Sequence, residues 1–151
     1  MFRYLRVVLT RFPGETLETL QAANFSNRLQ ADLFISLHLY ETKDSPKINF
    51  YYYAKDIYEQ PFRDNLFLCS LEDAHRFKNN ISKKIAEDLY NNLNNITNFS
   101  ISKPLGMPVL PLKGLVAPSV ALEIGLKNNN DWQELISPIV SSIHKIIRQD
   151  L

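Results

Sequence analysis

Cysteine, glycine and long apolar runs are all scarce in this chain, and each scarcity excludes a class of structure or function. Cys69 is the only cysteine among 151 residues, so no disulfide forms within the chain and the redox compartment cannot be inferred. The four glycines are too scattered to form a loop that cradles a nucleotide phosphate. No apolar segment approaches the ~18 residues that a membrane-spanning helix needs. We expect Cys69, which ends an apolar run, to be a small core residue, with a thiol nucleophile as the alternative.

An excess of charge of one sign is also missing. Lys and Arg number 17 and Asp and Glu 16, for a formal net charge of +1, which argues against binding nucleic acid or an anionic membrane through bulk charge. The residues after Met1 are typical of a strand and not of a secretory signal. Hydrophobic residues make up 45% of the chain, enough for the core of one folded domain.

Strand-like and helix-like segments alternate along the chain. This alternation predicts an α/β fold, in which a mixed or mostly parallel central sheet is flanked by helices. Two nearly continuous apolar runs, Ala31–His38 and Pro118–Ile124, are predicted as interior strands because both of their faces are apolar. The other predicted strands are Tyr4–Thr10, Ile48–Ala54, Phe99–Ser102 and Val109–Leu115, and the predicted helices are Thr16–Leu29, Leu71–Leu93 and Trp132–Leu151.

Both of the apolar runs finish with a side chain that could carry chemistry, His38 in one and Glu123 in the other. If the two strands are parallel neighbours, these side chains emerge at the same carboxyl edge of the sheet, where α/β folds place their ligands. A carboxylate in an apolar strand costs several kcal/mol to bury unless it is paired or serves a purpose. For His38 the alternative is a hydrogen-bonded capping group.

A histidine and a glutamate together are suited to metal-assisted hydrolysis, because zinc activates water and a carboxylate accepts its proton. A catalytic zinc normally has three protein ligands, of which His38 supplies one. The other histidines are weaker candidates. His75 lies in a polar helical stretch and is predicted at the surface, as is His144 in the last helix.

Short motifs occur along the chain in an order and spacing typical of one family. They are VVLTR at 7–11, Asn27, ADLFISLH at 31–38, SKKIA at 82–86, LKG at 112–114, PSVALEIGL at 118–126 and Asn129. With these motifs the chain resembles the type 3 N-acetylmuramoyl-L-alanine amidases, zinc-dependent enzymes of bacterial cell walls.

The resemblance implies a single amidase-like domain over residues 1–151 with a phosphorylase/hydrolase-like amidase fold. It implies that His38 is a zinc ligand and that Glu123 is the catalytic residue. The implied reaction hydrolyses the amide between N-acetylmuramic acid and L-alanine, with the peptidoglycan stem peptide and glycan as partners. It also implies a periplasmic or extracellular location, and an upstream segment or a protein activator as a further partner.

Several family features differ in this chain. The family's opening strand and first helix supply its other two zinc ligands, a histidine and a glutamate, and we expect the chain to begin after them, so that the domain is incomplete at its N-terminus. Leu39, Tyr40 and Leu126 replace the usual residues near the site. We therefore expect zinc to be absent or weakly bound by these residues alone. The alternative is that the chain is a catalytically inactive amidase-like domain with a peptidoglycan-binding, regulatory or protein-interaction role.

Overall fold

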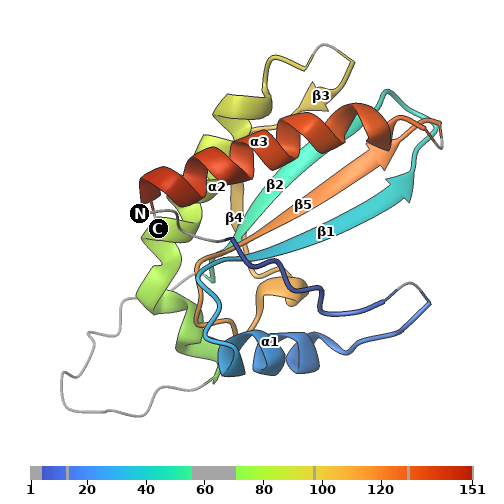
Figure 1. Cartoon of the computed structure of the whole chain (residues 1–151). Coiled ribbons are helices and arrows are strands. Elements are labelled where there is room, and N and C mark those ends of the chain that lie inside the picture. Colours follow the sequence, from blue (N-terminus) through green and yellow to red (C-terminus); the bar gives the residue numbers. More distant parts are fainter. Residues whose placement is uncertain (1–4, 13, 56–70, 97, 129, 151) are drawn as a thin grey trace.

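The computed structural model describes residues 5–12, 14–55, 71–96, 98–128 and 130–150, which form one mixed sheet with helices on both faces (Figure 1). None of the described helices is long and apolar enough to cross a lipid bilayer. The α-helices are α1 (Thr19–Arg28), α2 (Asn79–Leu93) and α3 (Trp132–Asp150), and two 3-10 helices are η1 (Leu71–Lys78) and η2 (Leu110–Leu112). The strands are β1 (Phe34–Glu41), β2 (Lys47–Tyr53), β3 (Ser100–Ile101), β4 (Leu105–Met107) and β5 (Ser119–Leu126).

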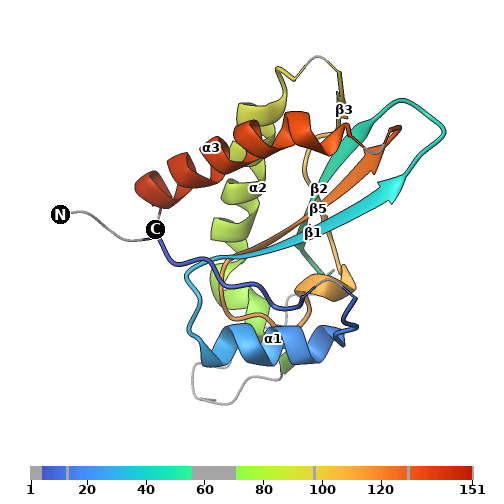
Figure 2. The same ribbon diagram turned by 45° about the vertical axis from the view of Figure 1, so that its right-hand side comes forward.

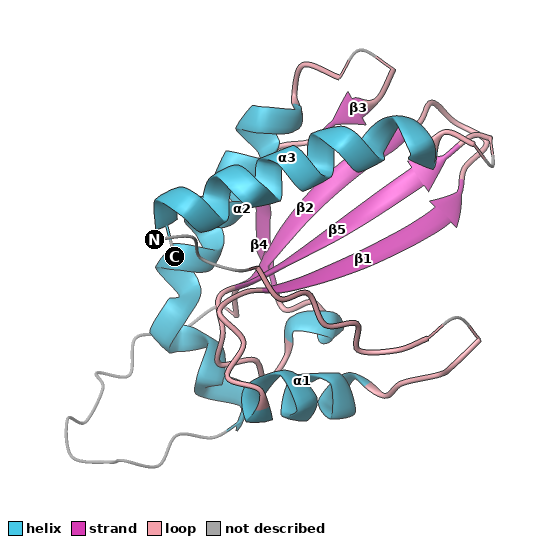
Figure 3. Cartoon of the chain, viewed as in Figure 1, coloured by secondary structure: helices cyan, strands magenta, loops and turns pink. Residues whose placement is uncertain are grey.

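The strands run in the order β1, β5, β2, β3, and β4 also pairs with β2 (Figure 3). β1 and β5 are parallel and pair over their whole lengths, with Phe34 opposite Ser119 and Glu41 opposite Leu126. β2 is antiparallel to β5 and parallel to β3 and β4. The predicted mixed, mostly parallel α/β sheet is therefore confirmed.

The main core lies between the sheet and the helices α2 and α3, on what we call the α2/α3 face (Figure 2). Every second residue of a strand points to this face, and in β5 these are aliphatic. The helices contribute residues at helical spacing, such as Ile85, Leu89 and Leu93 of α2, which are at most 1% exposed. The buried strand residues are Ile48, Phe50, Val120, Leu122 and Ile124. Packing of the last helix across the sheet, as predicted, is confirmed.

The opposite side, which we call the α1 face, carries a smaller core. Ala23 of α1 and Leu112 of η2 pack there with Tyr53, Leu115 and Ala121. In Figures 1 and 2, α1 lies below the end of the sheet at which β1 and β5 begin. The α1 face is thus packed at one end of the central strands, and the site described below lies on the same face, further along them.

Three strand predictions are wrong. β1 is an edge strand and not an interior one, because among the described strands only β5 pairs with it. Residues 5–10 of the predicted strand Tyr4–Thr10 form no strand, since a strand needs a hydrogen-bonded neighbour and no described strand offers one. In Val109–Leu115, the proline at 111 lies in the 3-10 helix η2, and the strand comes earlier, at β4. Tyr4 and Cys69 lie outside the described residues.

Candidate functional site

His38 and Glu123 lie opposite each other on neighbouring parallel strands. They are Cα partners in the pairing of β1 with β5, so their side chains point to the same side of the sheet. Adjacent strands lie about 4.8 Å apart, which brings an imidazole and a carboxylate together on the α1 face. Both strands continue for three residues beyond this pair, to Glu41 and Leu126, so the pair lies within the strands and not at their ends.

Tyr51 of β2 completes this group from the other side of β5. Its hydroxyl donates a hydrogen bond of 3.1 Å to Oε2 of Glu123. Burial, and then the hydrogen bond and charge of Glu123, raise the pKa of the Tyr51 phenol above its ordinary value of 10.0. Tyr51 therefore remains a protonated donor at neutral pH. Asn49, the Cα partner of Glu123 on β2, lies close enough to Tyr51 to hydrogen-bond its side chain.

Tyr40 forms an aromatic wall next to His38. The two rings are stacked with centroids 6.0 Å apart and an interplanar angle of 22°. The Tyr40 ring also lies over Gly125, where an added Cβ would come within 3.1 Å of it. A glycine at position 125 thus gives the Tyr40 ring room to lie over β5.

Two side-chain clamps fix the start of β5 and hence the position of Glu123. Asn27 of α1 donates from Nδ2 to the Gly114 carbonyl at 2.8 Å and accepts from the Val116 N–H at 3.0 Å. Ser82 of α2 accepts a hydrogen bond of 2.9 Å from the Ser119 N–H and donates to the carbonyl of Lys78, the N-cap residue of its helix. Asn27 and Ser82 both belong to the family-like motifs, and the structure gives each a structural role.

The remaining histidines lie elsewhere. His75, predicted at the surface, is only 5% exposed, and its ring lies against Tyr53 with centroids 4.3 Å apart. The prediction was wrong because η1 turns the His75 ring towards Tyr53 of β2. His144 is exposed on α3, as predicted. Sequence reasoning missed Tyr51, since three consecutive tyrosines give no sign of which one faces Glu123.

A catalytic zinc ion needs more ligands than the described residues of this site offer. Among the residues that the structure describes, no three His, Cys, Asp or Glu side chains are grouped so that they could hold a metal ion. His38 and Glu123 offer two donors, whereas a catalytic zinc normally has three protein ligands. The described residues alone therefore do not fit a catalytic zinc.

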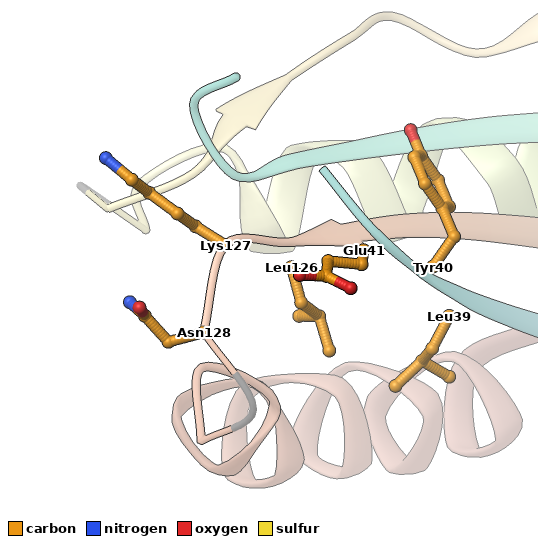
Figure 4. Close-up of a pocket in the computed structure, with 6 residues that line it drawn as sticks. All are labelled: Leu39, Tyr40, Glu41, Leu126, Lys127 and Asn128. Atoms are coloured by element: carbon orange, nitrogen blue, oxygen red, sulfur yellow. The ribbon is translucent and has the colours of Figure 1, made fainter. Parts of the chain in front are cut away.

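A shallow pocket lies near the site but on the other face of the sheet. Leu39 and Leu126 line it together with the loop that leads into α3 (Figure 4), and the full lining is Leu39, Tyr40, Glu41, Leu126, Lys127 and Asn128. Figure 4 shows Leu39 on the helix side of the strands and Tyr40 pointing away from that helix. This pocket includes neither His38 nor Glu123.

Comparisons with known proteins agree with the fold. The family described as N-acetylmuramoyl-L-alanine amidase (Amidase_3) matches residues 3–147. The N-acetylmuramoyl-L-alanine amidase from Clostridium difficile 630 is similar with a TM-score of 0.60 and 15% identity, over 97% of this chain and 74% of that chain. The catalytic domain of CwlV, an N-acetylmuramoyl-L-alanine amidase from Bacillus (Paenibacillus) polymyxa var. colistinus, is similar with a TM-score of 0.52 and 18% identity, over 95% of this chain and 73% of that chain. No functionally curated protein matches.

Proposed function

Because the chain belongs to the N-acetylmuramoyl-L-alanine amidase family, we propose that it acts on peptidoglycan and hydrolyses the amide between N-acetylmuramic acid and L-alanine. The observation that carries this proposal is the in-register pair of His38 and Glu123 on one face of the sheet. Peptidoglycan lies outside the cytoplasmic membrane, so the proposed place of action is periplasmic or extracellular. Its partners are the stem peptide and the glycan.

Glu123 is proposed as the residue that moves the proton. As water attacks the carbonyl carbon of the lactyl group, the carboxylate accepts one of its protons. The carbon–nitrogen bond then breaks, and Glu123 passes the proton to the nitrogen of L-alanine. The products are a carboxylic acid on the sugar and a free amino group on the stem peptide. A carboxylate in the middle of an interior strand suits this role because strands on both sides hold its backbone in place.

His38 is proposed as a metal ligand on the strength of the family resemblance alone. A complete zinc site needs donors beyond those of the described residues, so no step of the reaction is assigned to the metal. With His38 and Glu123 as the only close donors, we expect zinc to bind weakly and turnover to be low.

That same shortage of donors favours a second candidate function. A chain that retains the amidase fold but cannot hold zinc would bind peptidoglycan without cutting it, or serve as a regulatory or protein-binding domain. Tyr40 and His38 offer a stacked aromatic surface that suits contact with a sugar ring or a peptide.

One assay separates the two candidates. Purified cell walls are incubated with the chain, with and without added zinc, and the newly formed amino groups of L-alanine are counted alongside the zinc content of the protein. We expect slow release that rises with added zinc, and a loss of about a hundredfold or more in Glu123→Gln, since general base catalysis contributes that much. Glu41→Gln, which alters an exposed carboxylate at the end of β1, is the matched control.

The outcomes of this assay are distinct. Release that persists in Glu123→Gln would remove Glu123 from the mechanism. Binding to cell walls without any release would favour the second candidate. One tightly held zinc per chain, bound through His38, would show that a donor outside the described residues completes the site.

A further inference from the structure

The Glu123 carboxylate has a partner whose place in the sheet is fixed. Tyr51 stands on β2 opposite Ala121, two residues from Glu123 on β5, and reaches diagonally across the two strands. Its hydroxyl donates 3.1 Å to Oε2. Among the described residues, Tyr51 is the hydrogen-bond donor to the Glu123 carboxylate.

A glutamate without such a bond has several orientations open to it. Its side chain has three rotatable bonds, and each carries conformational entropy that must be lost before the carboxylate points one way. Its neighbours along β5 on the α1 face, Ala121 and Gly125, are small, so the side chains that border it come from β1 and β2. No side chain of β5 itself therefore holds the carboxylate in one orientation.

Tyr51, in contrast, is held firmly. Its ring is half-buried and packs against the cluster of Ala23, Tyr53, Leu112, Leu115 and Ala121. A tyrosine has only two side-chain torsions, and here the ring is restrained by its packing against this cluster. The hydroxyl therefore occupies one position beside Glu123.

We propose that Tyr51 is a positioning residue, whose hydroxyl holds Oε2 of Glu123 so that Oε1 is the oxygen that takes the proton from the attacking water. This role rests on the proposed amidase function. It assigns separate tasks to the two oxygens, because one is occupied by the tyrosine and the other accepts the proton. The raised pKa of Tyr51 agrees with a phenol that donates and does not itself give up its proton.

The kinetic test compares Tyr51→Phe with Tyr52→Phe in the zinc-supplemented chain, using soluble muropeptides. Tyr52 is the matched control because it is the next residue on the same strand, points to the α2/α3 face and packs against the main core. We expect Tyr51→Phe to lower kcat about tenfold, as for the loss of one hydrogen bond to a charged group, while KM changes less than about twofold. Tyr52→Phe should leave both constants close to those of the wild type. Equal kcat values in the two variants would overturn the proposal.

A second measurement does not depend on turnover. Crystal structures of the wild type and of Tyr51→Phe show directly where the Glu123 carboxylate points. We expect one orientation in the wild type, and a changed or multiple orientation in the variant. If the wild type releases no product, the proposed amidase function fails, and these structures still decide the role of Tyr51. An unchanged carboxylate in Tyr51→Phe would refute positioning by the hydroxyl.

Discussion

The two faces of the central sheet use the same strands for different purposes. On the α2/α3 face, β5 places Val120, Leu122 and Ile124, which are at most 2% exposed. On the α1 face, the alternating residues are Ala121, Glu123 and Gly125, two small residues around a carboxylate. The first face is filled by aliphatic volume. The second leaves room for Tyr51 of β2 to reach the carboxylate and for Tyr40 of β1 to lie over Gly125. We therefore expect mutations on the two faces to separate stability from activity.

The largest effect on stability is expected from Phe50→Ala on the α2/α3 face. Phe50 is fully buried and touches Tyr90 edge to face, with centroids 6.4 Å apart. Its truncation should lower the free energy of unfolding by about 3–5 kcal/mol, measured by urea denaturation. His38→Ala on the α1 face should change it by less than about 0.5 kcal/mol, because His38 is exposed. Similar losses in both would contradict the distinction between the faces.

A smaller loss is expected from Asn27→Ala, which removes the clamp on the loop before β5. The Gly114 carbonyl and the Val116 N–H both lose their partner, and each lost hydrogen bond costs about 0.5–1.5 kcal/mol net where water can replace the partner. Asn24→Ala, at an exposed position of the same helix, controls for the change in helix propensity and should stay within about 0.5 kcal/mol. Equal melting temperatures in the two variants would mean that the clamp does not stabilise the fold.

Two glycines allow a matched comparison of space on the two faces. An added Cβ at Gly106 would lie 2.7 Å from the Tyr52 ring, which packs against the main core, so Gly106→Ala should cost about 1–3 kcal/mol. At Gly125 the nearest atoms are those of Tyr40, at 3.1 Å, on the less crowded face. Gly125→Ala should therefore cost less than about 1 kcal/mol. The reverse order in thermal unfolding would place the tighter packing on the α1 face.

The smallest effect concerns alkaline pH. The pKa of Tyr51 is raised in the folded protein, first by burial and then by Glu123, so folding favours its protonated form. This contribution to stability is fully present below the unfolded value of about 10 and is lost as pH rises through the folded pKa. We expect wild-type stability to fall more steeply above pH 10 than that of Tyr51→Phe. Parallel curves in pH-dependent urea unfolding would show that Tyr51 does not contribute.

Much of the fold was predictable because hydrophobic periodicity depends on local spacing. Ile85, Leu89 and Leu93 recur every fourth residue and are buried on α2. The apolar runs that became β1 and β5 were correctly predicted as strands, and their parallel pairing brought His38 and Glu123 together. The roles of these two residues stay predictions.

Neighbours in space were not predictable from the same patterns. An apolar run such as Ala31–His38 indicates a strand but does not say whether one or two strands pair with it, so β1 was wrongly placed in the interior. Residues 5–10 have strand-like composition without a described strand beside them. His75 has polar neighbours in sequence and Tyr53 in space. Tyr51 could be identified only through the register of β2 on β5.

The central claim is that Glu123 is kept for chemistry and not for stability. Its neighbour Leu122 points to the opposite face and is 1% exposed, so the two residues form a natural pair. Urea unfolding of Leu122→Ala and Glu123→Ala tests the claim most directly. We predict a loss of about 2–5 kcal/mol for Leu122→Ala and a change within about 1 kcal/mol for Glu123→Ala. If Glu123→Ala destabilised the protein as much as Leu122→Ala, the carboxylate would be a structural group, and the claim would be contradicted.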